Sequence, residues 1–236
     1  MMIKQYPSFA ELAESATNTI AAIANHAITK RGRFSVALSG GNTTPPVYQQ
    51  LAHKDIAWQQ VYTFWADERC VPPDHPDSNY GAVHQALLSQ VPIPQENIYR
   101  MHGDIDPAQA AAEYEHQLRM FFGDVPRFDL IILGMGGDGH TASLFPGTAA
   151  IHETTRWVIG HYIEKLDAWR MTLTPMVINQ AAQVMFLVAG DGKAPALKQV
   201  LEGAYQPDLL PSQIVQPNDG ELVWMIDDAA GALLHA

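Results

Sequence analysis

Short, strongly apolar runs alternate along the chain with longer stretches in which polar and apolar residues are mixed. Such runs are typical of strands buried in a sheet, and the mixed stretches have the length and composition of helices. The expected strands are residues 34–38, 61–65, 128–133, 184–189 and 222–226. The expected helices are residues 8–30, 45–52, 78–90, 107–122 and 193–202. This alternation predicts an α/β protein with a mainly parallel sheet and helices on both faces.

Local signals support several helix starts. Ser8 and Glu11 have the spacing of a capping box, Ser78 can cap the third helix, and Pro107 suits the first turn of the fourth. No repeat, low-complexity tract or linker divides the sequence. We therefore expect a single α/β domain over residues 1–236.

Composition narrows the class of protein. The net charge of −11 makes nucleic acid or an anionic membrane an unfavourable partner, because both are polyanions. The one cysteine, Cys70, excludes an internal disulfide framework and fits a reducing compartment. We expect it to be a small half-buried residue at a strand end rather than a catalytic thiol. With no signal peptide and no apolar run of membrane-spanning length, a cytoplasmic location is expected.

Four of the expected strands are followed by conspicuous polar or glycine-rich segments. These segments are Ser39-Gly40-Gly41, Asp67-Glu68-Arg69, residues 134–140, and Gly190-Asp191-Gly192-Lys193. Ligands of parallel sheets bind beyond the carboxyl ends of the strands, and the topology brings these ends to one edge. The sequence therefore predicts a single site built from all four segments.

The segment from Ser39 to Thr44 has the chemistry of an anion-binding loop. The paired Gly40 and Gly41 let a backbone approach an anion closely, and the next helix offers free N–H groups and a favourable dipole. A plain tight turn between strand and helix explains this segment equally well. It lacks the lysine and the spacing of a nucleotide P-loop.

The loop at residues 134–140 formally matches the G-x-G-x-x-G dinucleotide fingerprint. Pro146 and Gly147 interrupt the helix that should follow, and no acidic residue lies at the required distance. A nicotinamide or flavin site is therefore not expected. His140 suits general acid–base catalysis, and Asp138 could orient it, although a histidine that merely caps a short helix is the structural alternative.

Three cations lie beside these motifs in a chain with only 14 lysines and arginines: Arg69, Arg170 and Lys193. Arginine suits bidentate phosphate contacts, and lysine contributes a point charge. Each could instead form a solvated salt bridge, and Arg69 in particular could pair with Asp67 or Glu68. The histidines show no H-x-x-x-H or H-E-x-x-H spacing, so no metal site is expected.

Together the motifs resemble the lactonase branch of the glucosamine-6-phosphate isomerase/6-phosphogluconolactonase family. The resemblance extends from about Phe34 to Gly203 and implies a Rossmann-like fold of the sugar-phosphate isomerase type. The matching blocks are Leu38–Asn42, Asp67–Pro72 with Ser78-Asn79-Tyr80, Gly134–Gly147, Arg170–Leu173 and Gly190–Lys193. One departure is Thr44, which stands where the family's phosphate loop usually has proline, with Pro45 one place later.

The resemblance implies hydrolysis of 6-phospho-D-glucono-1,5-lactone in the oxidative pentose phosphate pathway, without a cofactor. It assigns proton transfer to His140 and Asp138. The implied substrate and phosphate contacts are Ser39, Gly40, Gly41, Asn42, Asp67, Arg69, Arg170 and Lys193. The related deaminases carry a glutamate after the glycine loop and Asp-Glu-Tyr in the second block. This chain has Thr141–Pro146 and Asp67-Glu68-Arg69 there, which favours the lactonase.

Two rival functions remain at this stage. One is an isomerase or deaminase of the glucosamine-6-phosphate type, and the other is a non-catalytic sugar-phosphate sensor on the same fold. The sensor is disfavoured because the N-terminal helix offers no basic face to DNA. The expected partner is a phosphorylated sugar lactone, with the protein a monomer or a small homo-oligomer.

Overall fold

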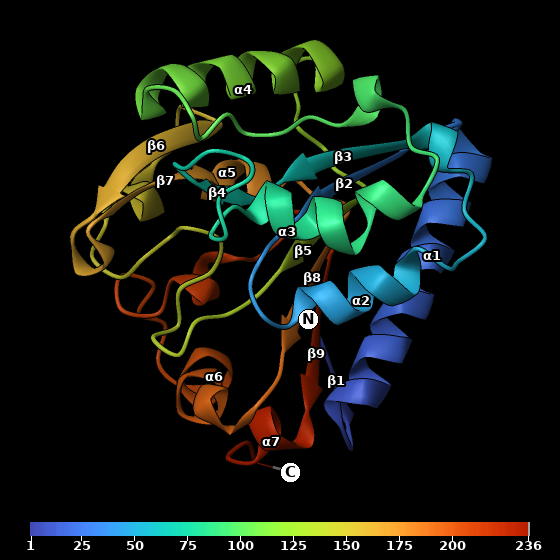
Figure 1. Cartoon of the computed structure of the whole chain (residues 1–236). Helices are drawn as coiled ribbons and strands as arrows, with labels where there is room; N and C mark the ends of the chain where they lie inside the picture. Colours follow the sequence, from blue (N-terminus) through green and yellow to red (C-terminus); the bar gives the residue numbers. More distant parts are fainter. Residues whose placement is uncertain (236) are drawn as a thin grey trace.

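A computed structural model of the chain describes residues 1–235 and shows a central sheet of six parallel strands (Figure 1). The strand order is β1-β9-β8-β5-β2-β3, and every pairing is parallel. The strands are β1 (Met2–Tyr6), β2 (Phe34–Leu38), β3 (Val61–Trp65), β5 (Leu130–Leu133), β8 (Gln183–Val188) and β9 (Glu221–Asp227). The central strands β2 and β5 are buried along their whole length, as strands covered on both faces must be.

Helices cover both faces of this sheet. On one face, Ile20 and Ala24 of α1 and Leu51 of α2 lie next to residues of β2 and β3. On the other face, Phe122 at the end of α4 packs on Phe64 and Phe128. The helices are α1 (Phe9–Arg31), α2 (Thr44–Leu51), α3 (Asn79–Ala86), α4 (Pro107–Phe122), α5 (Pro175–Ile178), α6 (Ala194–Glu202) and α7 (Asp228–Gly231). The predicted α/β class, mainly parallel with helices on both faces, is confirmed.

The predicted elements are present, with small shifts at their ends. Ser8 caps α1 by accepting a hydrogen bond from the Glu11 N–H at 3.3 Å, as the capping box indicates. The helix expected at residues 45–52 begins one residue earlier, at Thr44. The helix expected to reach residue 90 ends at Ala86, and a 3₁₀ turn at Leu88–Gln90 follows it.

A second, antiparallel sheet of three strands was not predicted from the sequence. Its order is β4 (Asp67–Arg69), β7 (Ala168–Leu173) and β6 (Val158–Ile163). Asp67-Glu68-Arg69, expected as a polar segment that follows the strand at 61–65, is thus a strand of the second sheet. Three residues are too few to show any periodicity, and β6 and β7 carry polar residues and a glycine among their apolar ones. Helix α4 packs on β6 and β7.

Glu68 links β4 to the start of α3 through hydrogen bonds. Its buried carboxylate accepts hydrogen bonds from the backbone N–H groups of Arg69, Asn79 and Tyr80, each at 2.7 Å. The Ser78 hydroxyl donates a further bond at 3.2 Å. Burial raises the pKa of Glu68, while these hydrogen bonds to the charged form oppose the rise. Glu68 is therefore a structural carboxylate at a helix N-terminus, and it does not pair with the Arg69 guanidinium.

We predict that Glu68→Ala lowers the free energy of unfolding by about 3 kcal/mol, because it leaves several buried N–H groups without an acceptor. Urea denaturation followed by circular dichroism measures this change. Glu96→Ala, which removes an exposed carboxylate from a surface turn, is the control and should leave the midpoint almost unchanged. Equal midpoints for the two variants would contradict the anchoring role of Glu68.

Candidate active site

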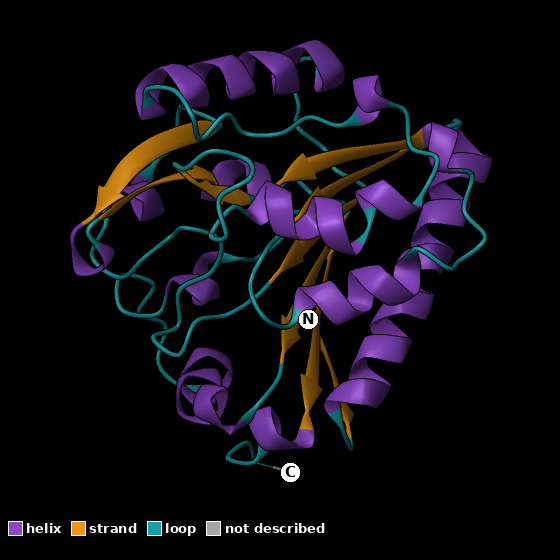
Figure 2. Ribbon diagram, in the orientation of Figure 1, coloured by secondary structure: helices purple, strands orange, loops and turns teal. Residues whose placement is uncertain are grey.

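The carboxyl ends of β8, β5, β2 and β3 lie at one edge of the sheet because these neighbouring strands are all parallel. Figure 2 shows their arrowheads pointing to the side where the long loops gather. The four polar or glycine-rich segments named in the sequence analysis follow these strands. One of them, Asp67–Arg69, follows β3 and forms strand β4. The convergence expected from the sequence is therefore confirmed.

His140 and Asp138 form a hydrogen-bonded pair in the loop after β5. The His140 Nδ1 atom lies 2.5 Å from Asp138 Oδ1, and the imidazole stacks on the Phe145 ring with centroids 4.1 Å apart. Hydrogen bonding from His140, together with a bond from Lys165, holds the pKa of Asp138 well below its usual range. An ionised Asp138 accepts from Nδ1–H, so the Nε2 atom of a neutral His140 is left free to take a proton.

The glycine loop folds back tightly on itself to present this pair. The Gly136 N–H donates to the His140 carbonyl at 2.8 Å, and the Thr141 hydroxyl donates to the Gly134 carbonyl at 2.8 Å. Gly139 has a φ of +78°, in the region that favours glycine, and its carbonyl accepts from the Ser212 N–H and hydroxyl. No helix begins between residues 134 and 148, so the loop does not lead into the helix N-terminus that a dinucleotide fingerprint requires.

Gly136 is required by the position of the imidazole. A Cβ atom added to Gly136 would lie 2.1 Å from His140 Nδ1 and 2.6 Å from Asp138 Oδ1. Real Cβ atoms do not approach neighbours this closely, so any larger residue would displace the pair. In contrast, a Cβ atom added to Gly134 would meet nothing within 4 Å.

Ser143 joins the histidine loop to the second sheet, a role that the sequence did not reveal. Its hydroxyl donates to Asp67 Oδ2 at 2.7 Å, and its N–H donates to the Thr172 hydroxyl at 3.3 Å. Its carbonyl accepts from His161 Nε2 at 2.9 Å. Burial lowers the pKa of His161, so this histidine is a neutral donor at physiological pH. Each strand of the second sheet thus supplies one contact to Ser143.

Arg69 and Arg170 lie directly opposite each other on β4 and β7. Within residues 1–235 neither guanidinium forms a salt bridge, and Arg69 donates instead to the Asp77 carbonyl at 2.5 Å. Burial lowers the pKa of Arg170, and the like charge of Arg69 lowers it further, although a guanidinium stays charged at neutral pH. Two facing cations repel each other, so this arrangement favours an anion between or beside them.

In the loop from Ser39 to Thr44, the backbone of the glycines is accessible to a ligand, whereas the serine is not. Ser39 is buried, its hydroxyl donates to the Ile132 carbonyl, and its N–H donates to the Tyr48 hydroxyl. The Ser39 side chain and N–H are therefore already engaged and are not free for a substrate. Gly41 has a φ of +91° and, like Asn42, is exposed.

Thr44 and Asn79 hold this loop in place. The Thr44 hydroxyl is placed to donate to the carbonyls of Ser39 and Gly40, each at 3.1 Å, so the residue found in place of the usual proline braces the loop. A Cβ atom on Gly40 would lie 1.9 Å from Asn79 Oδ1. Asn79 in turn donates to the Asp67 carbonyl at 2.8 Å. Asp67, predicted as a substrate contact, has its carboxylate committed to Ser143 and Asn79.

Lys193 lies at the start of α6, in the segment that follows β8. A Cβ atom on Gly137 would be 3.5 Å from the Gly192 carbonyl, so this segment lies against the histidine loop. Lys193 forms no salt bridge to any residue that the structure describes. Cys70 is half-buried, as expected, and burial raises its pKa to about 11, so its thiol is protonated and unreactive at neutral pH.

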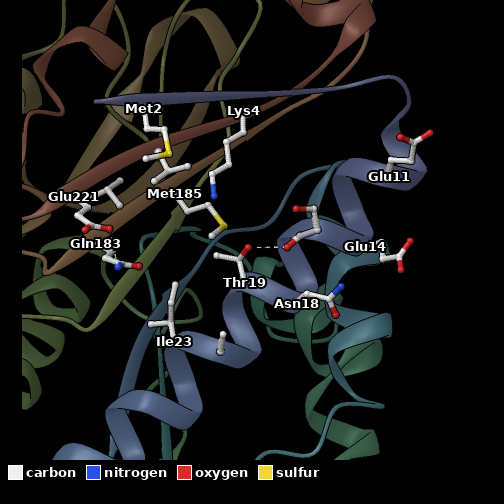
Figure 3. A pocket seen from close by; sticks show the side chains of 14 residues that line it. Met2, Lys4, Glu11, Glu14, Asn18, Thr19, Ile23, Gln183, Met185 and Glu221 are labelled. Atoms are coloured by element: carbon white, nitrogen blue, oxygen red, sulfur yellow. Dashed lines mark hydrogen bonds between the residues drawn. The ribbon is translucent and has the colours of Figure 1, made fainter.

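No group of three or more metal-ligating side chains occurs in residues 1–235, and no helix in this range is long and apolar enough to cross a membrane. A groove of about 570 Å³ lies between α1 and strands β1, β8 and β9, where Lys4, Glu14 and Met185 line it (Figure 3). None of the predicted site residues lines this groove.

Comparison with known proteins places the chain among sugar-phosphate enzymes. The family model for glucosamine-6-phosphate isomerases/6-phosphogluconolactonase matches residues 7–224. The chain is 45% identical over 214 residues to the 6-phosphogluconolactonase of Nostoc sp., with 88% of each chain covered. It is also 45% identical over 215 residues to that of Synechocystis sp., which covers 89% of this chain and 88% of the relative.

Solved structures agree over nearly the whole chain. The 6-phosphogluconolactonase of Thermotoga maritima superimposes with a TM-score of 0.86 at 28% identity, covering 96% of this chain and 99% of that one. The Trypanosoma brucei 6-phosphogluconolactonase gives a TM-score of 0.88 at 27% identity, covering 99% and 98%. These matches confirm the Rossmann-like α/β fold that the resemblance implied. The chain belongs to the glucosamine-6-phosphate isomerase/6-phosphogluconolactonase family.

Proposed function

We propose that this protein hydrolyses 6-phospho-D-glucono-1,5-lactone to 6-phospho-D-gluconate in the oxidative pentose phosphate pathway. The observation that carries the proposal is the His140–Asp138 pair, which lies at the same sheet edge as three cations that form no salt bridge within residues 1–235. The names of the relatives at 45% identity support the same substrate. Such a lactone is already activated, so neither a covalent nucleophile nor a metal is needed.

His140 acts as the general base and then as the general acid. Its Nε2 atom takes a proton from a water molecule as the water oxygen forms a bond to C1 of the lactone. When the bond between C1 and the ring oxygen breaks, Nε2 returns the proton to that oxygen, and the product is an open-chain acid. Asp138, kept ionised by its hydrogen bonds, holds the ring through Nδ1 and stabilises the imidazolium between the two steps.

The phosphate of the substrate is held away from the bond that breaks. We assign it to the backbone of Gly40 and Gly41 and to the charges of Arg69, Arg170 and Lys193, with Asn42 at the exposed rim of the loop. Binding energy gained at the phosphate places the lactone ring against His140. Ser39 and Asp67 act indirectly in this scheme, because they brace the phosphate loop and the histidine loop.

We also propose the setting in which the enzyme works. The net charge of −11 favours a freely diffusing small substrate over nucleic acid or an anionic membrane. The single half-buried thiol suits the reducing cytoplasm. We propose a single catalytic domain over residues 1–236, acting as a monomer or a small homo-oligomer.

We predict that His140→Ala lowers kcat by roughly 10²–10⁴-fold, the range for loss of a general base, with little change in KM. The assay generates the lactone freshly and couples product formation to a dehydrogenase, with spontaneous hydrolysis subtracted. Near-normal turnover in the variant would rule out His140 as the base. Release of ammonia from glucosamine 6-phosphate by the parent enzyme would instead favour the deaminase alternative.

We predict that Gly136→Ala lowers kcat by about 10²-fold, because the added methyl group displaces the imidazole by a fraction of an ångström or more. Gly134→Ala is the matched control in the same loop, since its methyl group meets open space, and it should retain most of the activity. The two variants are compared in the coupled assay after their folding is verified by circular dichroism. Similar losses in both would mean that the loop tolerates no change at all.

We predict that Arg69→Ala and Lys193→Ala each raise KM by about 10-fold or more while kcat changes less, as expected for lost charge-assisted hydrogen bonds. Inorganic phosphate should compete with substrate in the parent enzyme and compete more weakly in both variants. Arg127→Ala, which removes a guanidinium that pairs with Asp219, is the control and should leave KM unchanged. Unaltered phosphate competition in both site variants would place the phosphate elsewhere.

A further inference from the structure

Lys165 contacts the oxygen of Asp138 that His140 does not use. Its Nζ atom lies 2.8 Å from Asp138 Oδ2, while Asp138 Oδ1 lies 2.5 Å from His140 Nδ1. The ammonium, the carboxylate and the imidazole therefore form a continuous line of hydrogen bonds. Lys165 is 27 residues from Asp138 in the sequence, so no local motif reveals this contact.

The turn that carries Lys165 is well defined. It is the 3₁₀ turn Glu164–Leu166 between β6 and β7, and the pairing of Ile163 with Ala168 closes it. Asp167 completes the turn at a φ of +48°, where the Tyr162 hydroxyl donates to its carboxylate. Ile163 is buried beneath the turn. The backbone position of Lys165 is therefore fixed by the turn, although its side chain is long and flexible.

A cavity of about 680 Å³ borders the carboxylate on the side of the β6–β7 turn. Asp138, Phe145 and Lys165 are among the residues that line it. Phe145 and Asp138 are also the residues that contact the His140 ring. Without Lys165, water in this cavity could solvate Oδ2 and let the carboxylate turn away from the imidazole.

We propose that Lys165 is a positioning residue of the lactonase, which holds the Asp138 carboxylate so that Oδ1 stays on His140 Nδ1. This inference rests on the proposed function of His140 and deepens it. Lys165 itself touches neither the substrate nor the reacting atoms.

A role of Lys165 in catalysis is separable from a role in folding because the lysine side chain is largely exposed. The Lys165 side chain is 68% exposed and that of Asp138 is 27% exposed. Ion pairs of this kind add little to stability, so removal of the lysine should leave the unfolding midpoint almost unchanged. The other charged or titratable groups lining the cavity are Glu164 on the same turn, and His161 and Tyr162 on β6. His161 stays neutral at physiological pH because burial lowers its pKa.

The test compares Lys165→Met with Lys165→Arg and Glu164→Gln in the coupled assay. For Lys165→Met we expect kcat to fall by roughly 10-fold, up to the 10²-fold cost of a misplaced catalytic group, with a small change in KM. Lys165→Arg, which keeps a positive charge that can donate to Asp138, should restore most of the rate.

Glu164→Gln distinguishes the effect of the hydrogen bond between Lys165 and Asp138 from the effect of the overall charge of the turn. This substitution makes the turn more positive, whereas Lys165→Met makes it more negative, and it leaves the bond from Lys165 to Asp138 in place. Because exposed charges have only small energetic effects, kcat should stay within about twofold of the parent value. If Lys165→Met has the parent kcat, the proposal is wrong. It is also wrong if Lys165→Arg is as impaired as Lys165→Met.

Asp138→Asn identifies which proposal fails. In that background Lys165→Met should cause no further loss, because the two side chains act through one hydrogen-bonded line. A full additional loss would mean that Lys165 acts elsewhere. An inactive His140→Ala together with a normal Lys165→Met refutes only the positioning role. An active His140→Ala refutes the proposed function of the histidine itself.

Discussion

The attachment of Ser143 to the second sheet is the constraint on which the geometry of the site depends. The histidine loop leaves the central sheet after β5, whereas Arg69 and Arg170 belong to β4 and β7 of the other sheet. Ser143 receives one contact from each strand of that sheet, through Asp67, Thr172 and His161. The proposed base and the two arginines of the proposed phosphate site work together only at a fixed separation. These three hydrogen bonds hold the histidine loop against the sheet that carries the arginines.

The same bonds explain a strained residue beside the histidine. Ala142 has a φ of +47°, in the left-handed region that a residue with a Cβ rarely adopts, at a cost of about 1 kcal/mol or more. Such strain persists only when the flanking structure determines it. On one side Thr141 is bound to the Gly134 carbonyl, and on the other Ser143 is bound to the second sheet. The bend between them turns the chain after His140, which leaves the imidazole between Gly136 and Phe145.

What the sequence could predict depended on how local the signal was. The strand at residues 34–38 and the helix from Pro107 to Phe122 follow from apolar runs and end signals, and His140 with Asp138 follows from two residues in one glycine loop. Strand β4 was missed because three polar residues carry no period. The contacts of Ser143 with Asp67 and of Asp138 with Lys165 were missed, because these residues are far apart in the sequence and meet only after the chain has folded.

An enzyme with a net charge of −11 and a phosphorylated substrate also needs an electrostatic account. Repulsion between exposed charges is screened beyond about 8 Å at physiological ionic strength, so the total charge matters little once the substrate reaches the cleft. Inside the cleft, the charges of nearby side chains determine whether a phosphate is attracted or repelled. The carboxylate of Glu68, next to Arg69, accepts hydrogen bonds from the start of α3. The carboxylate of Asp67 accepts hydrogen bonds from Ser143 and Asn79. The fold thus occupies these two carboxylates with its own donors, which supports the proposal that the two facing arginines bind the phosphate.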